Sequence, residues 1–325
     1  MRRSIARLIG SPFVAADIGA RGDLPRHWLP LDGQADIFAF DADPAACSAL
    51  ARTYAGRGHG ERYHIQPVAL GRADEVRPLY RTRTGGGTSL FRPDTDLVRR
   101  YANHEYSAVA EVAELQVRHA GRYFEEIGLT DVDLLKADVQ GAELEVLEAL
   151  AGILPTVVAL ETEVQFHDRG NGMPAFCDLH RFLVGQGFEL FDLGLARQHP
   201  TTRGRRAHSL EPFGVVEASP SIARRLWFGD ALYFRGAVTD PRKLDNLLTC
   251  LCLYGFFTEA MAALQRAEDE GRMPAAETER RRGEIVAWHR QRRRWRYGRS
   301  RPARLCRWVL GYFDLREHPP WSWRR

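Results

Sequence analysis

Short apolar runs alternate with amphipathic stretches along the first 236 residues. The runs predict strands, because they are short, rich in Val, Ile, Leu and Phe, and flanked by Gly, Asp or Pro. The predicted strands cover residues 13–19, 36–44, 63–71, 132–138, 156–164 and 230–236, and residues 111–128 and 176–194 each contain a further strand beside a helix. Stretches between them, such as residues 44–55, have the spacing of helices. This alternation predicts an α/β fold with a mostly parallel sheet and helices on both faces.

The pattern changes after residue 239. A helical stretch with one apolar face follows, and residues 280–307 then hold 12 arginines against one glutamate. Residues 240–325 carry a net charge of +8, whereas the whole chain carries +4. We therefore expect two parts: a domain over 1–239 and a basic helical C-terminal extension over 240–325.

Several partners fit this extension. An arginine-rich segment binds an anionic glycan, RNA or a lipid surface, or is simply a solvated basic helix. Peripheral membrane contact is favoured by Trp308, Trp321 and Trp323 near the end of the chain. Much of the arginine excess reflects composition, since the chain has 44 arginines and only two lysines, Lys136 and Lys243. The sequence does not predict an oligomeric state.

Composition excludes some classes of protein. No run of 18 apolar residues occurs, so no transmembrane segment is expected. Residues 1–16 resemble a signal peptide only faintly, because Gly10, Ser11 and Pro12 interrupt the apolar run. Five dispersed cysteines without a C-x-x-C motif indicate reduced thiols and a cytoplasmic location. They support neither a zinc site nor a disulfide framework.

In a parallel sheet, ligands bind beyond the carboxyl ends of the strands. The first strand ends in "DIGARGD", residues 17–23. Its small residues Gly19, Ala20 and Gly22 allow the backbone to turn tightly and to approach a ligand. This is not the G-x-G-x-x-G fingerprint, and Asp17 suits a cationic amino-acid moiety better than a pyrophosphate. An ordinary glycine turn is the alternative.

The second and third strands add to this candidate site. The second ends in "FDADP", where Asp41 is placed to accept a hydrogen bond from a ribose diol and Ala42 follows it. Asp43 before Pro44 is better explained as a helix N-cap. Val68 and Ala69 lie at the exit of the third strand. Together these residues predict a nucleoside ligand, and the missing phosphate fingerprint favours S-adenosylmethionine over NAD.

The fourth strand carries the most specific pattern, "VDLLKADVQGAELEVLEAL" over residues 132–150. With "DIGARGD", "AFDADP" and "PVALG" upstream, it resembles the FkbM family of S-adenosylmethionine-dependent methyltransferases, whose signature reads "vDllKiDvEGaEleVL". Gln140 stands where the family usually has glutamate. The resemblance covers about residues 13–236. It implies a class I methyltransferase (Rossmann-like) fold and usually O-methylation, often of sugars in glycans or natural products.

In that fold the fourth strand lies beside the first and the fifth, so Asp138 and Glu161 are expected to face one pocket near the methyl donor. Two carboxylates there hold Mg²⁺ or orient a hydroxyl group, and Glu163 is a second candidate partner for Asp138. Lys136 points to the same face as Asp138 and keeps it ionised. A buried Lys–Asp pair that only fixes the strand is the alternative.

Methyl transfer to a hydroxyl group also needs a proton acceptor. His167, just after the fifth strand, is the predicted general base, with a loop histidine of no role as the alternative. Glu143 is expected to interact with the dipole of its helix. The sequence thus predicts an S-adenosylmethionine-dependent O-methyltransferase of a sugar hydroxyl in a small molecule or glycan. The alternatives are an RNA methyltransferase and a non-catalytic nucleoside-binding module.

Overall fold

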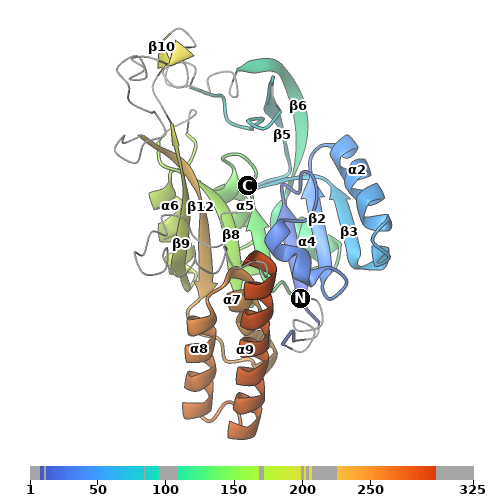
Figure 1. The fold of residues 1–325 in the computed structure, drawn as a ribbon. Helices are drawn as coiled ribbons and strands as arrows, with labels where there is room; N and C mark the ends of the chain where they lie inside the picture. Colours follow the sequence, from blue (N-terminus) through green and yellow to red (C-terminus); the bar gives the residue numbers. More distant parts are fainter. Residues whose placement is uncertain are drawn as a thin grey trace.

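The computed structural model describes residues 8–10, 12–83, 85–94, 108–167, 172–198, 201–202, 205–206 and 225–297. Its centre is a seven-stranded sheet with the order β3-β2-β1-β7-β8-β12-β9 (Figure 1). The strands are β1 (Val14–Ile18), β2 (Asp36–Asp41), β3 (Tyr63–Pro67), β7 (Leu134–Ala137), β8 (Ala159–Gln165), β9 (Phe188–Gln198) and β12 (Arg225–Arg235).

The five strands from β3 to β8 run parallel, and β12 pairs antiparallel with both β8 and β9. The carboxyl ends of β1, β2, β7 and β8 therefore lie at one edge of the sheet. β8 is buried along its whole length, as expected for a central strand covered on both faces. The predicted α/β class with a mostly parallel sheet is confirmed.

One face of the sheet is covered by α4 (Ala120–Glu126), α5 (Glu143–Ala149) and α6 (Phe176–Gly185). The other is covered by α2 (Pro44–Ala55), the 3₁₀ segment η1 (Arg26–Leu31) and α7 (Pro241–Tyr254). A further 3₁₀ turn, η2 (Gly60–Arg62), precedes β3, and η3 (Leu154–Thr156) precedes β8. Helices on both faces, as predicted, give two apolar cores, one on each side of the sheet.

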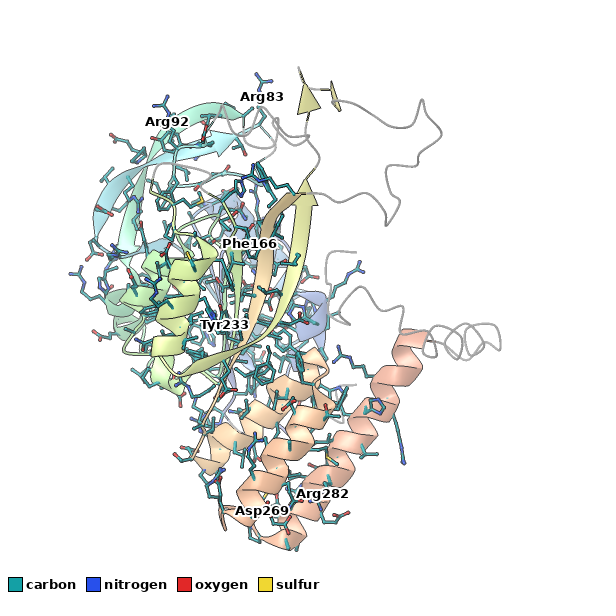
Figure 2. The ribbon with its side chains drawn as sticks, turned by 90° about the vertical axis from the view of Figure 1, so that its left-hand side faces the viewer. Arg83, Arg92, Phe166, Tyr233, Asp269 and Arg282 are labelled. Carbon is teal, nitrogen blue, oxygen red and sulfur yellow. The ribbon has the colours of Figure 1, made fainter. Side chains whose placement is uncertain are left out.

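A second, three-stranded sheet stands at the carboxyl edge of the large one. It pairs β4 (Ala69–Gly71), β6 (Val109–His119) and β5 (Glu75–Thr82) in the order β4-β6-β5. Figure 1 shows β5 and β6 projecting beyond the large sheet, and Figure 2 shows Arg83 and Arg92 at this end of the molecule. A pair of two-residue strands, β10 (Thr201–Thr202) and β11 (Arg205–Arg206), completes the strands that the structure describes.

The C-terminal region forms α7, α8 (Phe257–Asp269) and α9 (Ala275–Tyr297). α8 and α9 extend away from the sheet, opposite to β5 and β6 (Figure 1), with Asp269 and Arg282 near their far end (Figure 2). α7 is different, because nearly all of its side chains are buried in the same apolar core as β1 and β2. The division at residue 239 stays a prediction, and this packing favours placing α7 with the sheet.

Other expectations concern the cysteines and contact with a membrane. Cys47, Cys177, Cys250 and Cys252 are free thiols, and Cys306 lies outside the described residues. Among the residues that the structure describes, no helix is both long and apolar enough to span a bilayer. Trp308, Trp321 and Trp323, on which membrane contact was predicted, also lie outside them.

Candidate functional site

Charged side chains of three adjacent strands form a row near the carboxyl edge of the sheet. Asp17 of β1 is in register with Lys136 of β7, and Lys136 is in register with Glu161 of β8. The Lys136 Nζ lies 3.0 Å from Asp17 Oδ1 and 3.7 Å from Asp138 Oδ2. The prediction that Lys136 and Asp138 point to one face is confirmed, and Asp17 is added as the closer partner.

The row is almost closed to solvent, since Asp17 is 6% and Glu161 2% exposed. Burial alone lowers the pKa of a lysine, but the carboxylates of Asp17, Asp138 and Glu161 outweigh it and hold the pKa of Lys136 above its ordinary range. Lys136 is therefore a fixed ammonium group. It offsets the negative charge of its neighbours.

Gly19 lets the exit of β1 lie directly against the exit of β7. Its φ is +88°, and a Cβ on it would lie 2.0 Å from the carbonyl oxygen of Asp138. The backbone N–H groups of Gly19 and Ala20 both donate to the carbonyl of Phe40 on β2. Gly22 also has a positive φ, +101°, but a Cβ there would meet nothing within 4 Å. At position 19, both the positive φ and the close approach of Asp138 require glycine. At position 22, only the positive φ favours glycine.

The larger of two cavities at this edge has a volume of about 540 Å³. Predicted nucleoside-binding residues line it, namely Gly19, Asp41, Ala42, Val68 and Ala69, and so do Lys136 and Asp138. Asp17 lines only the smaller cavity, and Ala20 and Gly22 line neither.

Asp41 is held at the wall of the larger cavity by its own loop. Its Oδ1 accepts the N–H of Asp43 at 2.7 Å. Burial raises the pKa of Asp41, although the hydrogen bond from Asp43 opposes this. Asp43 itself caps α2 by accepting the N–H of Ala45 at 2.9 Å, so its predicted N-cap role is confirmed.

The glycine-rich stretch after β5 forms another part of the wall of the larger cavity. Gly85, Gly86, Thr88 and Ser89 line it together with residues of β5. Two hydrogen bonds tie this wall to the strand exits: Arg21 Nη1 donates to the carbonyl of Gly85 at 2.7 Å, and Ser89 Oγ donates to the carbonyl of Gln140 at 2.7 Å. The small sheet and the loop after β5 thus contribute to the lining of the cavity.

The smaller cavity, of about 250 Å³, adjoins the larger one through their shared lining of Arg21, Lys136 and Asp138. Its lining is dominated by charge. It comprises six carboxylates, three cations, one histidine and three other residues: Asp17, Asp23, Asp138, Glu161, Glu163, Asp230, Arg21, Arg26, Lys136, His27, Pro25, Ala137 and Thr162. A cavity of this kind suits a strongly polar ligand with many hydrogen-bonding groups.

Glu161 is the carboxylate with the most contacts in this cavity. Its Oε2 lies 2.9 Å from His27 Nε2 and accepts the hydroxyl of Tyr254 at 2.7 Å. Burial opposes ionisation, but His27, then Lys136 and the Tyr254 hydroxyl, hold the pKa of Glu161 below its ordinary value. Because an ionised carboxylate only accepts hydrogen bonds, His27 carries a hydrogen on Nε2 in this contact.

Sequence reasoning missed His27 and Tyr254. His27 lies in η1, a segment that follows Pro25, contains Pro30 and lacks the periodicity of a strand or long helix. Tyr254 is the last residue of α7, which the apolar pattern predicted as a packing helix. Only the tertiary fold brings these two residues to Glu161, so no local pattern marked them.

Asp138 has Glu163, rather than Glu161, as its immediate carboxylate neighbour. Gln140 Nε2 joins the pair, donating to Asp138 Oδ1 at 2.9 Å and to Glu163 Oε2 at 2.7 Å. Gln140 adopts a φ of +58°, which is uncommon for a residue with a side chain. An amide group therefore occupies the space between the two carboxylates.

This arrangement bears on the predicted Mg²⁺. Asp138, Glu143 and Glu163 have oxygens within 4.8 Å of one another, but Glu161 is not among them. The Glu143 carboxylate accepts the backbone N–H groups of Val139 and Gly141 at 2.9–3.0 Å, which fixes the turn after β7. Gln140 donates to one oxygen of each of the other two acids. Amide hydrogens thus occupy at least one oxygen of all three carboxylates, and the group does not fit a divalent cation as it stands.

His167 lies away from the two cavities. Its Nδ1 is 3.0 Å from the carbonyl oxygen of Trp227, and its ring packs against the Trp227 ring at 3.8 Å between centroids. Neither cavity has His167 among its described lining residues. Its predicted role as general base is untested, and His27 is the histidine that the fold places at the smaller cavity.

Solved structures resemble the chain only distantly. Against the FkbM methyltransferase of Methylobacillus flagellatus the identity is 15% and the TM-score 0.35, covering 69% of this chain and 43% of that one. Against TrmK of M. capricolum, solved with S-adenosyl-homocysteine, the identity is 10% and the TM-score 0.32, covering 89% and 96%.

Sequence comparison is more specific. The chain is 31% identical over 157 residues to the 2-O-methyltransferase NoeI of Sinorhizobium fredii, a match covering 45% of this chain and 61% of that protein. The methyltransferase FkbM domain matches residues 17–190, which is more than half of the chain and spans the exits of β1, β2, β7 and β8. The chain therefore belongs to the FkbM methyltransferase family.

Proposed function

We propose that this protein transfers a methyl group from S-adenosylmethionine to a hydroxyl group of a sugar. The observation that carries the proposal is the pair of adjoining cavities that share Lys136 and Asp138. The larger cavity is the donor site and the smaller one is the acceptor site. Lys136 and Asp138 then stand at the junction where the methyl group passes.

The residues of the larger cavity fit the donor. Gly19 lines the larger cavity and presents only backbone atoms to a ligand there. Asp41 supplies a carboxylate at the end of β2, where a ribose diol donates hydrogen bonds. When bound there, S-adenosylmethionine supplies a methyl group activated by the positive sulfonium.

The smaller cavity favours a polyhydroxylated acceptor. Its carboxylates accept hydrogen bonds from hydroxyl groups, and Arg21, Arg26 and Lys136 donate to hydroxyl or ring oxygens. Apolar aromatic acceptors are disfavoured, because they would desolvate these charges without returning hydrogen bonds. The similarity to a 2-O-methyltransferase supports the same class of reaction.

The groups lining the acceptor site orient the hydroxyl and take its proton. Alignment of the oxygen with the methyl group is the main requirement of this transfer. Asp138, at the junction, orients the hydroxyl, while the Lys136 ammonium keeps the pocket from accumulating negative charge. His27 accepts the proton at Nδ1, because its Nε2 already carries a hydrogen directed at Glu161, whose carboxylate stabilises the cation that forms.

The test is methyl transfer from labelled donor to a panel of monosaccharides, oligosaccharides and nucleotide sugars, read by mass spectrometry. We expect label on a sugar hydroxyl. Asp138→Asn should lower turnover by about two orders of magnitude or more and leave donor affinity by calorimetry within a few-fold. Asp36→Asn, at the amino end of β2, is the matched control.

Other outcomes of this experiment would support one of the two alternative functions. Label on RNA, with salt-sensitive RNA binding, would replace the sugar by a nucleic acid. Donor binding without transfer to any acceptor on the panel would favour a non-catalytic nucleoside-binding module. The described arginines at the start of α9 give RNA binding little support, since Arg280, Arg281 and Arg282 form ion pairs with acids of the same chain.

A further inference from the structure

The C-terminal end of α7 contacts Glu161, a lining residue of the acceptor site. Tyr254, the last residue of α7, is fully buried. Its hydroxyl donates to Glu161 Oε2 at 2.7 Å and accepts the indole N–H of Trp28 at 3.1 Å. The hydroxyl therefore has a defined donor and a defined acceptor, and its orientation is fixed.

These contacts join three elements, each of which is bonded to the other two. Trp28 and His27 are neighbours in η1, Tyr254 belongs to α7, and Glu161 belongs to β8. Glu161 Oε2 is shared by His27 and Tyr254, and the rings of these two residues lie 5.1 Å apart. Moving any one of the three elements would break two contacts at once.

The end of α7 is itself held firmly. Gly255 ends the helix with a φ of +99°, and its N–H donates to the carbonyl of Leu251. Arg292 of α9 donates to the carbonyls of Cys252 and Leu253 at 2.8 and 2.7 Å. These bonds satisfy the last carbonyls of the helix, so Tyr254 does not lie at a frayed end.

We propose that Tyr254 is a positioning residue for methyl transfer: through the Glu161 carboxylate, it holds the His27 imidazole in place at the acceptor site. This inference rests on the proposed function, and it extends the functional site beyond the family match, which ends at residue 190. Burial and the neighbouring carboxylate hold the pKa of Tyr254 well above its ordinary value, so it remains a donor.

A structural role alone predicts a different result from a positioning role. The matched control is Tyr233, a buried tyrosine on the opposite face of the sheet, whose hydroxyl is 3.2 Å from His180 Nδ1. Each of the variants Tyr254→Phe and Tyr233→Phe removes one buried hydroxyl group. The Tyr254 hydroxyl bonds the carboxylate that contacts His27, and the Tyr233 hydroxyl contacts His180. Only the first loses a hydrogen bond to the acceptor site.

The first measurement needs no acceptor. In full-length protein labelled with ¹⁵N-histidine and saturated with S-adenosyl-homocysteine, the His27 Nε2–H signal is assigned by its loss in His27→Asn. We expect slow solvent exchange of this hydrogen in the wild type and in Tyr233→Phe. In Tyr254→Phe its exchange should be at least about tenfold faster, because loss of a hydrogen bond to a charged group frees the carboxylate that holds it.

The second measurement uses whichever acceptor the wild type methylates. Tyr254→Phe should lower kcat about tenfold, with an unchanged KM for the donor. The acid limb of its pH profile should move to higher pH, since Glu161 loses a hydrogen bond that lowers its pKa. The other titratable groups facing Glu161, namely Asp17 of β1, Lys136 of β7 and His27 of η1, are unaltered in this variant.

The two measurements distinguish failure of the proposed function from failure of the positioning role. If the wild type methylates no sugar, the proposed function fails. The exchange rate of the His27 hydrogen still tests whether Tyr254 holds His27 through Glu161. If that exchange rate is the same in Tyr254→Phe as in the wild type, the positioning role is wrong. A lower melting temperature alone, with normal exchange and kcat, would mean that Tyr254 only packs.

Discussion

Gly19 is the residue at which the strand exits have least room. Alanine there must adopt a φ of +88° and place its Cβ against the Asp138 carbonyl. The conformation alone costs about 1–2 kcal/mol, and relieving the overlap would separate β1 from β7. We expect Gly19→Ala to lower donor affinity at least tenfold by calorimetry. Gly22→Ala, with open space around it, should have a smaller effect, and equal effects would contradict this account.

Gln140 is the residue that determines whether the nearby carboxylates can bind Mg²⁺. Its amide donates to Asp138 and Glu163, where a divalent cation would need those oxygens. We therefore expect methyl transfer to be unchanged by EDTA and by added Mg²⁺. Gln140→Glu would replace the donor by a fourth carboxylate beside Asp138, Glu143 and Glu163, and should make activity or melting temperature respond to Mg²⁺. Loss of wild-type activity in EDTA would contradict the prediction.

Among the elements, α7 depends on a buried ion pair. Lys243 Nζ, in its first turn, donates to Asp133 Oδ1 at 2.6 Å and to the carbonyl of Val132 at 3.2 Å, and also pairs with Asp131. Asp133 is completely buried, and its other oxygen accepts the N–H of Val14 on β1. One lysine thus ties α7 to the starts of two strands.

Lys243→Met should leave the Asp133 charge poorly compensated. Removing one partner of a buried pair costs about 3 kcal/mol or more, so we expect a loss of that size in the free energy of unfolding, measured by urea titration. Arg282→Met, which removes partly exposed ion pairs of α9, should cost less than about 1 kcal/mol. A loss below about 1 kcal/mol for Lys243→Met would show that α7 is not anchored in this way.

For the whole molecule, the question is whether the C-terminal region is separable. Leu244, Leu248 and Leu251 of α7 share a core with strands β1 and β2. A chain cut after residue 239 would expose that core, so we expect no cooperative thermal transition by calorimetry. A chain cut after residue 297 retains every described contact and should melt like the full chain. Donor binding by the shorter chain would support a separate appendage.

Sequence patterns predicted most of the fold, because burial imposes local periodicity. The predicted helix at 44–55 begins and ends where α2 does, capped by Asp43 as expected. β5 was missed, since Pro78 interrupts its pattern; a proline is tolerated because β5 lies at the edge of the small sheet.

The candidate site was predicted only as far as strand exits define it. Asp17, Asp41, Lys136 and Asp138 lie at or next to the carboxyl ends of strands, so their meeting at one edge follows from parallel pairing. Nothing local marks Tyr254 or His27, because each contact with Glu161 spans more than 90 residues of chain. The amide of Gln140 between two carboxylates also depends on the turn conformation, which the sequence does not reveal.

The long separation between Glu161 and Tyr254 has a consequence for how the protein is made. Ribosomes release the chain from its N-terminus, and early segments fold first. The strands that frame the donor side, β1, β2 and β7, emerge well before α7. A nascent or prematurely terminated chain thus lacks the tyrosine that completes the acceptor side. We expect the chain to acquire its catalytic competence only after α7 has emerged, so products truncated before residue 241 should not methylate its substrates.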